Sequence, residues 1–471
     1  MTRSNTTDFR RRAVLGGGIA AAAMATSPGA LFAQDGPVLQ WWDIFAPLTD
    51  MNQRFWDAFE ESGRGRVEYT NTNPATSMQA LQLAFRSGES PDIFDVDGDP
   101  ATLASLYEAG WFAPLTGLEF DSPFQQATLV EGATVFDGNQ VSVAIFSNLW
   151  HNASLWYDSE KMAAAGGDPE AGIATWAEAH DLARAATGDG YFGLLLPLQF
   201  TNRMGALWED IAMAAGAAGT FDPQTGDYAY TSQPFLDALD FLLQFQRDGS
   251  LHPASSSVDA RQGRQRWAAE EAMMFFDGPW NSGVLNRIAP EFLAKTGVSN
   301  VPTPNGEAPI LNRGAQFGHY YVSGQSEHRE LAIELLQNFT SDAYYVELAS
   351  RMDQPPLDLS AVERADVHPT YSTVIGNFSE SVFRGPDPLI SNPATAQVFS
   401  RMNPVTPGLG EIIQGAFSGA FDDATPFLQE FSDAMSRERD KGIEEAQAAG
   451  FDVSHDDWVF PDWVRGEDYR G

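Results

Sequence analysis

Residues 270–280 read EEAMMFFDGPW, and this stretch sets the expectation for the whole fold. Its five consecutive apolar residues suit a short strand that is buried on both faces, as in a sheet covered by helices. The run stops at Asp-Gly-Pro, because proline cannot donate to a sheet ladder and glycine can turn sharply. A tryptophan, Trp280, follows directly. The stretch therefore predicts a buried strand with the largest type of side chain standing just beyond its end.

The segments before this strand alternate between strands and helices. We expect strands at residues 38–44, 66–72 and 93–96, each followed by a helix, at residues 50–61, 77–88 and 102–109. This order predicts an α/β fold with doubly wound sheets. Ligands of such sheets bind outside the carboxyl ends of the strands. Those ends carry the residues Trp41, Trp42, Asp43, Asp97 and Asp99.

The pattern continues through the rest of the chain. We expect further strands at residues 141–145, 154–157, 191–198, 273–276, 297–300 and 319–324. We expect helices at residues 176–186, 204–215, 233–247, 327–341 and 342–350, and mostly helical structure from there to about residue 450. Thr175 is expected to cap the helix that begins at Trp176. Proline-rich crossings interrupt the pattern at residues 301–304 and 355–357.

Length and composition set the outer bounds. A chain of 471 residues is too long for one ordinary core, so two or more lobes are expected. Its 43% hydrophobic and 12% aromatic content is typical of a globular protein. The formal net charge of −36 argues against nucleic acid or an anionic membrane as a partner. We interpret this acidity as a solubility feature.

The N-terminus has the composition of an export signal. A basic front, a short apolar middle and a small-residue end predict a signal peptide over residues 1–33, with Ala33 as the last residue removed. The pair Arg11-Arg12 with Val14-Leu15 is similar to the twin-arginine signal, although Arg10 stands where that signal prefers Ser or Thr. A Sec signal is the alternative. The sequence therefore predicts a soluble protein of the periplasm.

Several kinds of site are excluded by what the sequence lacks. The absence of cysteine excludes disulfides, thiolate metal sites and a lipid-modified cysteine anchor. The motif GDGYFG at residues 188–193 runs into a predicted strand and lacks the helix of a dinucleotide site. The motif DVDGDP at residues 95–100 has Pro100 where a calcium loop needs glycine. We therefore expect no cofactor and no metal.

Six segments in a fixed order carry a family resemblance. They are LQWWDI, SGESPDIFDVDGD, ATWAEAHDLA, RQRWAAEEAMMFFDGPW, VPTPNG and LAIELLQNFTSDAYYVELASRMDQPP. The most specific are A-x-W-x-E at residues 174–178 and A-M-x-x-x-x-G-P-W at residues 272–280. Together they resemble the family 1 extracellular solute-binding proteins of ABC transporters, the maltose-binding-like sugar receptors.

The resemblance implies a two-lobed, type II-like receptor that closes on its ligand about a hinge. The N-terminal lobe would comprise residues 34–146 and 305–356, and the C-terminal lobe residues 147–304 and 357–471. The chain would cross near Phe146, at residues 301–304 and at residues 355–357. The implied partners are a sugar or polyol ligand and the membrane permease subunits of the transporter, with the receptor itself a monomer.

The resemblance also implies that Trp280 lies at the cleft between the lobes and stacks on a sugar ring. A pyranose offers an apolar face of C–H groups and a rim of hydroxyls, so an aromatic ring with nearby carboxylates and amides suits it. Where the family often has Gly-Gly, this chain has Gln316-Phe317. The expected ligand-binding residues are Trp42, Asp43, Asp97, Asp99, Trp150, Phe200, Asn202, Trp280, Asn281, Gln316, Phe317 and Gln354. Packing roles are expected for Trp56, Trp111, Trp176 and Trp267.

Two other functions remain open at this level. An exported, acidic, tryptophan-rich chain suits a glycoside hydrolase, which needs two carboxylates across its cleft, and Asp43, Asp97 and Asp99 are candidates. A receptor for another small solute, such as a polyol or a glycerol phosphodiester, is the second alternative. The anionic phosphodiester would need an arginine in the cleft, and Arg203, Arg313 and Arg351 are candidates. Neither alternative has a motif of its own in the sequence, so we expect binding without catalysis. Which of Trp41 and Trp42 faces the cleft also stays open, because neighbouring strand residues point to opposite faces.

Overall fold

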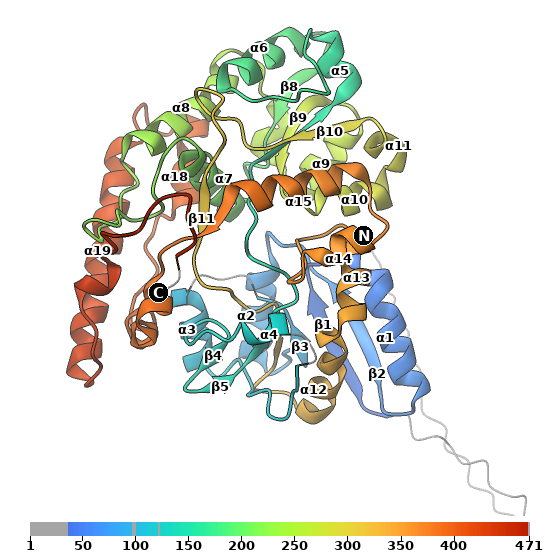
Figure 1. Cartoon of the computed structure of the whole chain (residues 1–471), viewed down its shortest axis with the longest axis vertical. Helices are drawn as coiled ribbons and strands as arrows, with labels where there is room; N and C mark the ends of the chain where they lie inside the picture. The colour runs from blue at the N-terminus through green and yellow to red at the C-terminus, as the bar shows by residue number, and fades with distance from the viewer. Residues whose placement is uncertain (1–35, 97–99, 121–122, 470–471) are drawn as a thin grey trace, which may run out of the picture. The chain divides into compact units, whose positions relative to one another are not determined.

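Two sheets organise the chain in a computed structural model that describes residues 36–96, 100–120 and 123–469 (Figure 1). The first sheet has the strand order β2-β1-β3-β12-β6. Its strands are β1 (Val38–Asp43), β2 (Arg66–Asn71), β3 (Ile93–Phe94), β6 (Ser142–Val143) and β12 (Tyr320–Val322). Strand β1, next to the edge strand β2, runs parallel to β2 and β3, whereas β12 runs antiparallel to β3 and β6. The three N-terminal strands therefore end at one common edge.

The second sheet has the order β10-β7-β9-β8. Its strands are β7 (Ser154–Asp158), β8 (Phe192–Leu195), β9 (Ala272–Asp277) and β10 (Thr296–Ser299). Every residue of β9 is buried, as the apolar run predicted, and β9 pairs with β8 in parallel and with β7 antiparallel. The predicted buried strand before Trp280 is therefore confirmed.

Helices cover the sheets (Figure 1). Those that accompany the first sheet are α1 (Thr49–Glu61), α2 (Ser77–Ser87), α3 (Pro100–Glu108), α4 (Pro123–Gln126), α12 (Arg329–Gln337), α13 (Asp342–Ser350) and α14 (Ser360–Arg364). The others are α5 (Ser159–Ala164), α6 (Trp176–Ala186), α7 (Thr201–Ala214), α8 (Gln233–Arg247), α9 (Ala260–Ala268), α10 (Asn281–Ile288), α11 (Pro290–Leu293), α15 (Pro369–Ser381), α16 (Pro388–Ser391), α17 (Ala396–Phe399), α18 (Leu409–Ser418) and α19 (Thr425–Ala448).

Short elements complete the chain. The 3-10 helices are η1 (Ala46–Leu48), η2 (Pro253–Ser257), η3 (Asn338–Thr340), η4 (Pro393–Thr395) and η5 (His455–Trp458). Two small sheets pair β4 (Val135–Phe136) with β5 (Asn139–Gln140) and β11 (Leu311–Arg313) with β13 (Val382–Arg384). Neither small sheet was predicted, because strands of two or three residues leave no periodic signal.

Local sequence signals account for the longer elements. Helix α6 begins where predicted, because the Thr175 side chain accepts a hydrogen bond from Glu178 N at 3.1 Å. The Glu178 carboxylate in turn accepts a bond from Ala174 N at 3.0 Å. In β1 the burial alternates, with Trp41 fully buried and Trp42 half-buried. The period-2 rule thus separates the two tryptophans, and Trp41 is the core residue.

Two of the predicted crossings run side by side. Phe146 pairs with Pro356 as an isolated antiparallel bridge, and Ser147 N donates to Pro355 O at 2.8 Å. The strands of the first sheet come from residues before the first of these crossings and from the stretch 320–322. The strands of the second sheet all come from residues 154–299. The residue-by-residue lobe boundaries given above stay a prediction.

A third apolar core, separate from the cores of the two sheets, was not predicted. Its buried residues are Ala133, Leu389, Ala396, Val398, Phe399, Met402, Ile443, Ala446, Val453 and Trp458. Helix α17, which supplies part of it, packs on both α3 and α19. The third core therefore links a helix that accompanies the first sheet to the long C-terminal helix.

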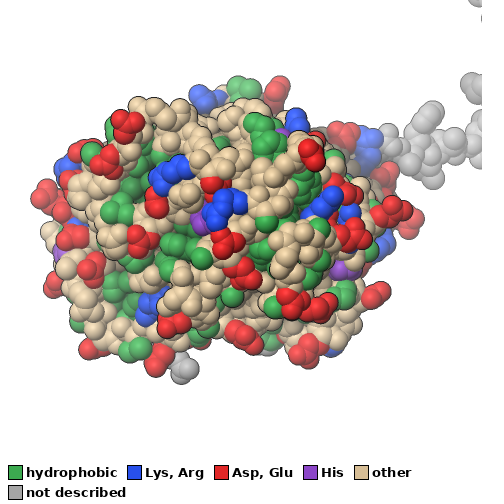
Figure 2. All heavy atoms as spheres, turned by 90° about the horizontal axis from the view of Figure 1, so that it is seen from above, with side chains coloured by type: hydrophobic (Ala, Val, Ile, Leu, Met, Phe, Trp, Pro, Cys, Tyr) green, Lys and Arg blue, Asp and Glu red, His purple; other side chains and the backbone are tan. Residues whose placement is uncertain are grey.

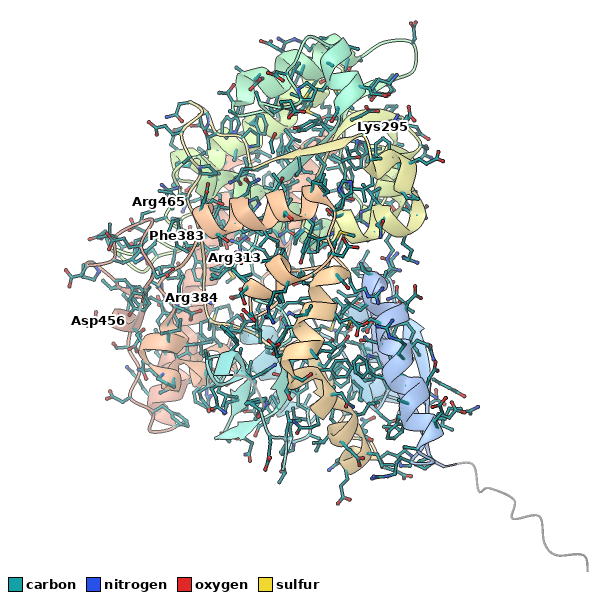
Figure 3. The ribbon with its side chains drawn as sticks, turned by 45° about the vertical axis from the view of Figure 1, so that its right-hand side comes forward. Lys295, Arg313, Phe383, Arg384, Asp456 and Arg465 are labelled. Carbon is teal, nitrogen blue, oxygen red and sulfur yellow. The ribbon has the colours of Figure 1, made fainter. Side chains whose placement is uncertain are left out.

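The last described residues pack back onto the molecule. Asp468 Oδ1 accepts a hydrogen bond from Arg384 N at 2.8 Å, and Tyr469 N donates to Arg384 O at 2.8 Å. Arg465 donates to Ile310 O at 2.8 Å, and Figure 3 shows Arg465 near Phe383 and Arg384. The C-terminal segment thus adds its backbone to β13. On the face shown in Figure 2, acidic side chains are scattered among polar and apolar ones, in keeping with the net charge of −36.

Candidate functional site

Trp280 stands at the junction between β9 and α10. It is half-buried, and its Nε1 donates to Asp277 Oδ1 at 2.8 Å, so the ring folds back toward the strand that precedes it. A Cβ on Gly278 would lie 2.4 Å from the Trp280 ring, so only glycine permits this approach. The G-P-W sequence therefore fixes the orientation of the indole.

Two further groups contact the Trp280 ring. Trp150 meets it edge-on, with ring centroids 5.1 Å apart and an interplanar angle of 83°. The guanidinium carbon of Arg203 lies 4.6 Å from the ring centroid. Two of the predicted site residues, Trp150 and Trp280, are thus brought together, although they are 130 positions apart in the sequence.

An ion-pair network lies beneath the aromatic pair. Asp277 is 1% exposed and forms ion pairs with two arginines. Its Oδ1 lies 2.6 Å from Arg203 Nη2, and its Oδ2 lies 2.6 Å from Arg264 Nη2. A buried carboxylate is stable only when it is paired in this way. Because two guanidinium groups share one carboxylate, these three residues together carry one net positive charge.

A second buried ion pair adjoins the first. Arg313 NH2 lies 2.5 Å from Asp210 Oδ1, and Asn152 N donates to Asp210 Oδ2 at 2.7 Å. Arg203 also donates to Asn152 Oδ1, so Asn152 joins the two networks. Arg313 Nε donates to Trp150 O at 2.8 Å, which fixes the backbone that carries Trp150.

Several buried polar atoms near Trp280 have no hydrogen-bond partner among the described residues. They are Nδ2 and Oδ1 of Asn281, Oε1 of Gln354 and Nε1 of Trp150. Gln354 lies on the segment that packs on the start of α10, where Gly283 N donates to Met352 O at 3.1 Å. More than nine in ten buried polar groups in proteins are paired, so these atoms keep hydrogen-bonding capacity that a bound ligand or water can use. Unpaired buried atoms also occur elsewhere in the described chain, for example in His180 and Tyr191.

The edge of the first sheet meets the second half of the chain at the start of α9. Arg261 NH2 donates to Asn71 Oδ1 at 2.8 Å and to Thr72 O at 2.7 Å, beyond the ends of β1 and β2. Asn73 Nδ2 donates to Asp259 Oδ2 at 2.8 Å. Burial and the neighbouring Arg264 lower the pKa of Arg261. Arg261 and Arg264 were not predicted, although their i, i+3 spacing on one helix face was a usable signal.

Asp43 lies at that same edge and is fully enclosed. Its carboxylate accepts hydrogen bonds from Tyr69 Oη at 2.6 Å and Tyr320 Oη at 3.1 Å, and from Phe45 N at 3.1 Å. Burial raises the pKa of Asp43 to about 6, against the opposing effect of these hydrogen bonds. Both of its oxygens accept hydrogen bonds from the protein. A ligand could bind Asp43 only if one of these donors moved, so the ligand contact of Asp43 stays a prediction.

The remaining predicted residues are spread more widely. Asp97 and Asp99 lie outside the described residues. Trp42 and Phe317 are half-buried against the same apolar cluster. Gln316 is 6% exposed and committed to the protein, because its Nε2 donates to Phe146 O at 3.1 Å and its Oε1 accepts from Asn148 N at 3.0 Å. Its place is therefore beside the first crossing, and its ligand contact stays a prediction.

The two predicted residues before and in α7 differ in exposure. Phe200 immediately precedes the helix and is half-buried, whereas Asn202 lies in its first turn and is exposed. Their neighbour Arg203 faces inward to Trp280 and Asp277. The structure thus brings the adjacent Arg203 into the group around Trp280, and it shows no contact of Phe200 or Asn202 with that group.

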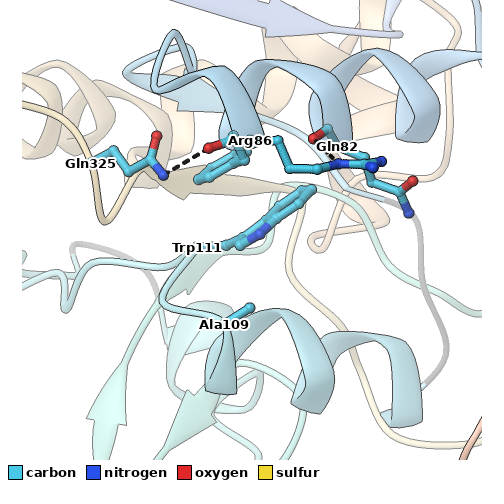
Figure 4. Close-up of a pocket in the computed structure, with 6 residues that line it drawn as sticks. Gln82, Arg86, Ala109, Trp111 and Gln325 are labelled. Carbon is cyan, nitrogen blue, oxygen red and sulfur yellow. Dashed lines mark hydrogen bonds between the residues drawn. The ribbon is translucent and has the colours of Figure 1, made fainter.

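A separate hollow of about 500 Å³ lies elsewhere on the surface (Figure 4). It is lined by Gln82, Phe85, Arg86, Ala109, Trp111 and Gln325. Phe85 and Trp111 stack on each other at 3.9 Å, and Gln325 Nε2 donates to Phe85 O at 3.0 Å. Because none of its lining residues carries an unpaired buried polar atom, this hollow is a weaker candidate than the group around Trp280.

Membrane-spanning helices and metal-binding clusters can be assessed for the described part of the chain. Within it, no helix has the length and apolarity that a membrane span requires. No group of three or more His, Asp or Glu side chains within it is arranged to hold a metal ion.

Comparisons with known proteins place this geometry in context. A family profile described as bacterial extracellular solute-binding protein matches residues 46–346. No curated protein matches the chain significantly in sequence.

Solved structures of solute-binding proteins match the fold. The first is an ABC transporter solute-binding protein from Thermotoga lettingae bound to α-D-tagatose, with a TM-score of 0.64 and 18% identity over 87% of this chain and 100% of that one. The GacH receptor of Streptomyces glaucescens, solved unliganded and with acarbose, gives 0.63 and 17% over 86% and 98%. The maltotriose-binding protein of Thermus thermophilus, bound to maltotriose, gives 0.61 and 17% over 88% and 100%. These matches show a two-lobed binding-protein fold.

Proposed function

Because the chain belongs to the bacterial extracellular solute-binding protein family, we propose that it is the receptor of an ABC importer for a sugar or oligosaccharide. It would bind the sugar between its lobes and deliver it to the permease subunits in the membrane. Similar folds were solved with tagatose, acarbose and maltotriose, which supports this ligand class.

One observation carries the proposal: an oriented indole stands beside unpaired amide groups. Trp280 offers the flat apolar surface that covers the C–H face of a pyranose. The adjacent Asn281 has an unpaired donor and an unpaired acceptor, and Gln354 has an unpaired acceptor. Donors and acceptors of this kind match the hydroxyl rim of a sugar, and they reject ligands that leave them unpaired.

The charged groups favour an uncharged ligand over a glycerol phosphodiester. Each candidate arginine already lies close to a carboxylate of the chain: Arg203 beside Asp277, Arg313 beside Asp210 and Arg351 beside Glu347. A phosphodiester would have to displace one of these pairs. A polyol remains a second candidate, because it also presents neutral hydroxyls, but it lacks the flat face that Trp280 would cover.

Binding without catalysis completes this proposal. The family and the similar structures are binding proteins. A hydrolase would need two carboxylates free to act on the sugar, and the carboxylate of Asp43 is held by two tyrosine hydroxyls.

We further propose that the lobes are residues 34–146 with 305–356 and residues 147–304 with 357–471. The adjacent crossings at Phe146 and at residues 355–356 support this division, since a hinge needs few connecting strands. Under this division, helix α17 of the second lobe also contacts helix α3 of the first, in addition to the crossings. The signal over residues 1–33, export to the periplasm without a lipid anchor, and a monomeric state are parts of the same proposal.

A thermal-shift screen tests the proposed function. Suitable ligands are D-tagatose, maltotriose, raffinose and acarbose, with glycerol and glycerophosphocholine for the alternatives. A specific ligand at 100-fold above its Kd stabilises the folded state by about 2.7 kcal/mol, so a true ligand raises the melting temperature measurably. Stabilisation by a saccharide, with the same saccharide recovered intact by chromatography after long incubation, supports the proposal. Stabilisation by glycerophosphocholine alone, or conversion of the sugar, overturns it.

A further inference from the structure

Asp353 lies two residues before the last of the three expected crossings, residues 355–357, and is 3% exposed. The segment that carries it packs tightly on the start of α10, because a Cβ on Gly283 would lie 2.1 Å from Arg351 O. Met352 has a φ of 55°, a left-handed conformation that costs free energy for a residue with a side chain. Tertiary contacts therefore hold Asp353 against the helix that begins directly after Trp280.

The hydrogen bonding of Asp353 differs from that of its neighbour Asp277. Asp277, equally buried, accepts bonds from two arginines, from Trp280 Nε1 and from Gly278 N. Among the described residues, Asp353 accepts one hydrogen bond, from Gln354 N at 2.8 Å. A buried carboxylate with one backbone donor retains acceptor capacity that only an outside donor can use.

The charged surroundings of Asp353 are those of the Trp280 group. Burial raises the pKa of Asp353 to about 7, against the lowering effect of the hydrogen bond from Gln354 N. The charges of Asp43 and Asp277 also raise this pKa, and that of Arg264 lowers it. Tyr344 and Tyr371 also face Asp353, and its charge raises the pKa of both hydroxyls. An ionised Asp353 would offset the excess positive charge that Arg203, Arg264 and Asp277 share.

We propose that Asp353 is the acidic residue that accepts hydrogen bonds from hydroxyl groups of the bound sugar, beside Asn281 and Gln354. The assignment rests on the proposed sugar-binding function. It gives Asp353 the role that sequence reasoning gave to Asp43, whose oxygens already bind two tyrosine hydroxyls and backbone. A carboxylate forms stronger hydrogen bonds than an amide, so Asp353 would distinguish sugars by the hydroxyls they present to it.

The assignment predicts a specific pH dependence. Ligand hydroxyls that donate to Asp353 favour its ionised form, so sugar binding should release a proton near neutral pH. With the pKa of Asp353 raised to about 7 in the free protein, the affinity should rise about tenfold from pH 6 to pH 8. Asp43, with its pKa raised to about 6, would contribute mainly below this range.

The test compares wild type with Asp353→Asn by titration calorimetry at pH 6, 7 and 8. The probe is whichever of D-tagatose, maltotriose, raffinose and acarbose binds wild type most tightly. We expect Asp353→Asn to bind about 10- to 100-fold more weakly at pH 8 and to lose the pH dependence of affinity. Asp387→Asn is the matched control: Asp387 is also a buried carboxyl with a raised pKa, but it bonds to Ala315 N and Leu389 N away from Trp280.

Each outcome bears on the assignment. An Asp353→Asn variant that binds as tightly as wild type with the same pH profile overturns the role of Asp353 and leaves the sugar receptor intact. Failure of wild type to bind any of the four saccharides overturns the proposed function itself. If the variant does not fold, titrations of wild type at pH 7 in buffers of different ionisation enthalpy decide: net proton release on binding supports the assignment, and its absence overturns it.

Discussion

Replacing Trp280 with alanine should weaken sugar binding far more than it weakens the fold. In the proposed site the indole is the only flat apolar surface assigned to the sugar ring, and a central aromatic contact of this kind is worth about 2–4 kcal/mol of binding free energy. The Kd should therefore rise by about 30- to 1000-fold.

The expected loss of stability follows from the contacts of the indole. Trp280→Ala removes the edge contact with Trp150, the contact with Arg203 and the hydrogen bond to Asp277. Together these contribute about 2–3 kcal/mol to the free energy of unfolding. Asp277 keeps both of its arginines, so no buried charge is left unpaired. A fully buried tryptophan such as Trp267 would cost about 3–5 kcal/mol.

Paired calorimetry and urea denaturation on three variants separate binding from folding. Trp176→Ala is the control, because Trp176 is also half-buried, stacks on Phe241 at 4.7 Å and donates to Pro302 O at 2.8 Å. It should lose a similar amount of stability and no affinity. Trp280→Phe should recover part of the affinity, since a ring remains. If Trp280→Ala binds sugar as tightly as wild type and only unfolds more easily, the indole is a packing residue and the reasoning fails.

Three other predictions follow from separate features. Replacing Arg11 and Arg12 with lysine should leave uncleaved precursor in the cytoplasm on immunoblots of cell fractions, whereas normal processing would point to Sec export. Because the pKa of Asp353 is raised in the folded state, the folded protein holds a proton that the unfolded chain releases. The contribution of this proton to the free energy of unfolding is fully present below about pH 4 and is lost as the pH rises to about 7. Asp353→Asn should therefore flatten that part of the stability profile in denaturation curves from pH 4 to 8, and an unchanged slope would contradict the shift. Phe399→Ala, in the third core, should cost about 3–5 kcal/mol of stability. If this core holds α3 and α19 together, the variant should also have a larger ligand-free radius of gyration by X-ray scattering. An unchanged radius would contradict that role.

Local signals made much of the fold predictable. The capping threonine at position 175 and the amphipathic period placed α6 at its observed bounds, and helices α8 and α13 also match their predicted residues. The apolar run before Trp280 predicted β9, and strand alternation separated Trp41 from Trp42. These features depend on residues within a few positions of each other, which is the range that sequence patterns report.

Long-range contacts were beyond that range. The hydrogen bonds of Arg261 to Asn71 and Thr72 join residues about 190 positions apart, and no local pattern specifies them. The enclosure of Asp43 involves Tyr320, which lies 277 positions later in the sequence. Asp353 was not among the expected site residues, and its burial depends on tertiary packing that no local pattern specifies.

The sequence also reached part of the candidate site. Trp150 and Trp280 were among the expected ligand-binding residues, and the structure places their rings in contact. The ligand contacts of these two residues, of Asn281 and of Gln354 stay predictions. Arg203 was expected only as a possible cleft arginine and Arg264 was not expected, because their pairing depends on Asp277 at the end of β9, which sequence reasoning treated as a strand terminator.

A crystal structure of the protein with its tightest-binding saccharide tests the central claim most directly. The account predicts a sugar ring stacked within about 4 Å of the Trp280 indole, with its hydroxyls bonded to Asn281, Gln354 and Asp353. A sugar bound elsewhere, with Asn281 and Gln354 still without partners, would contradict it.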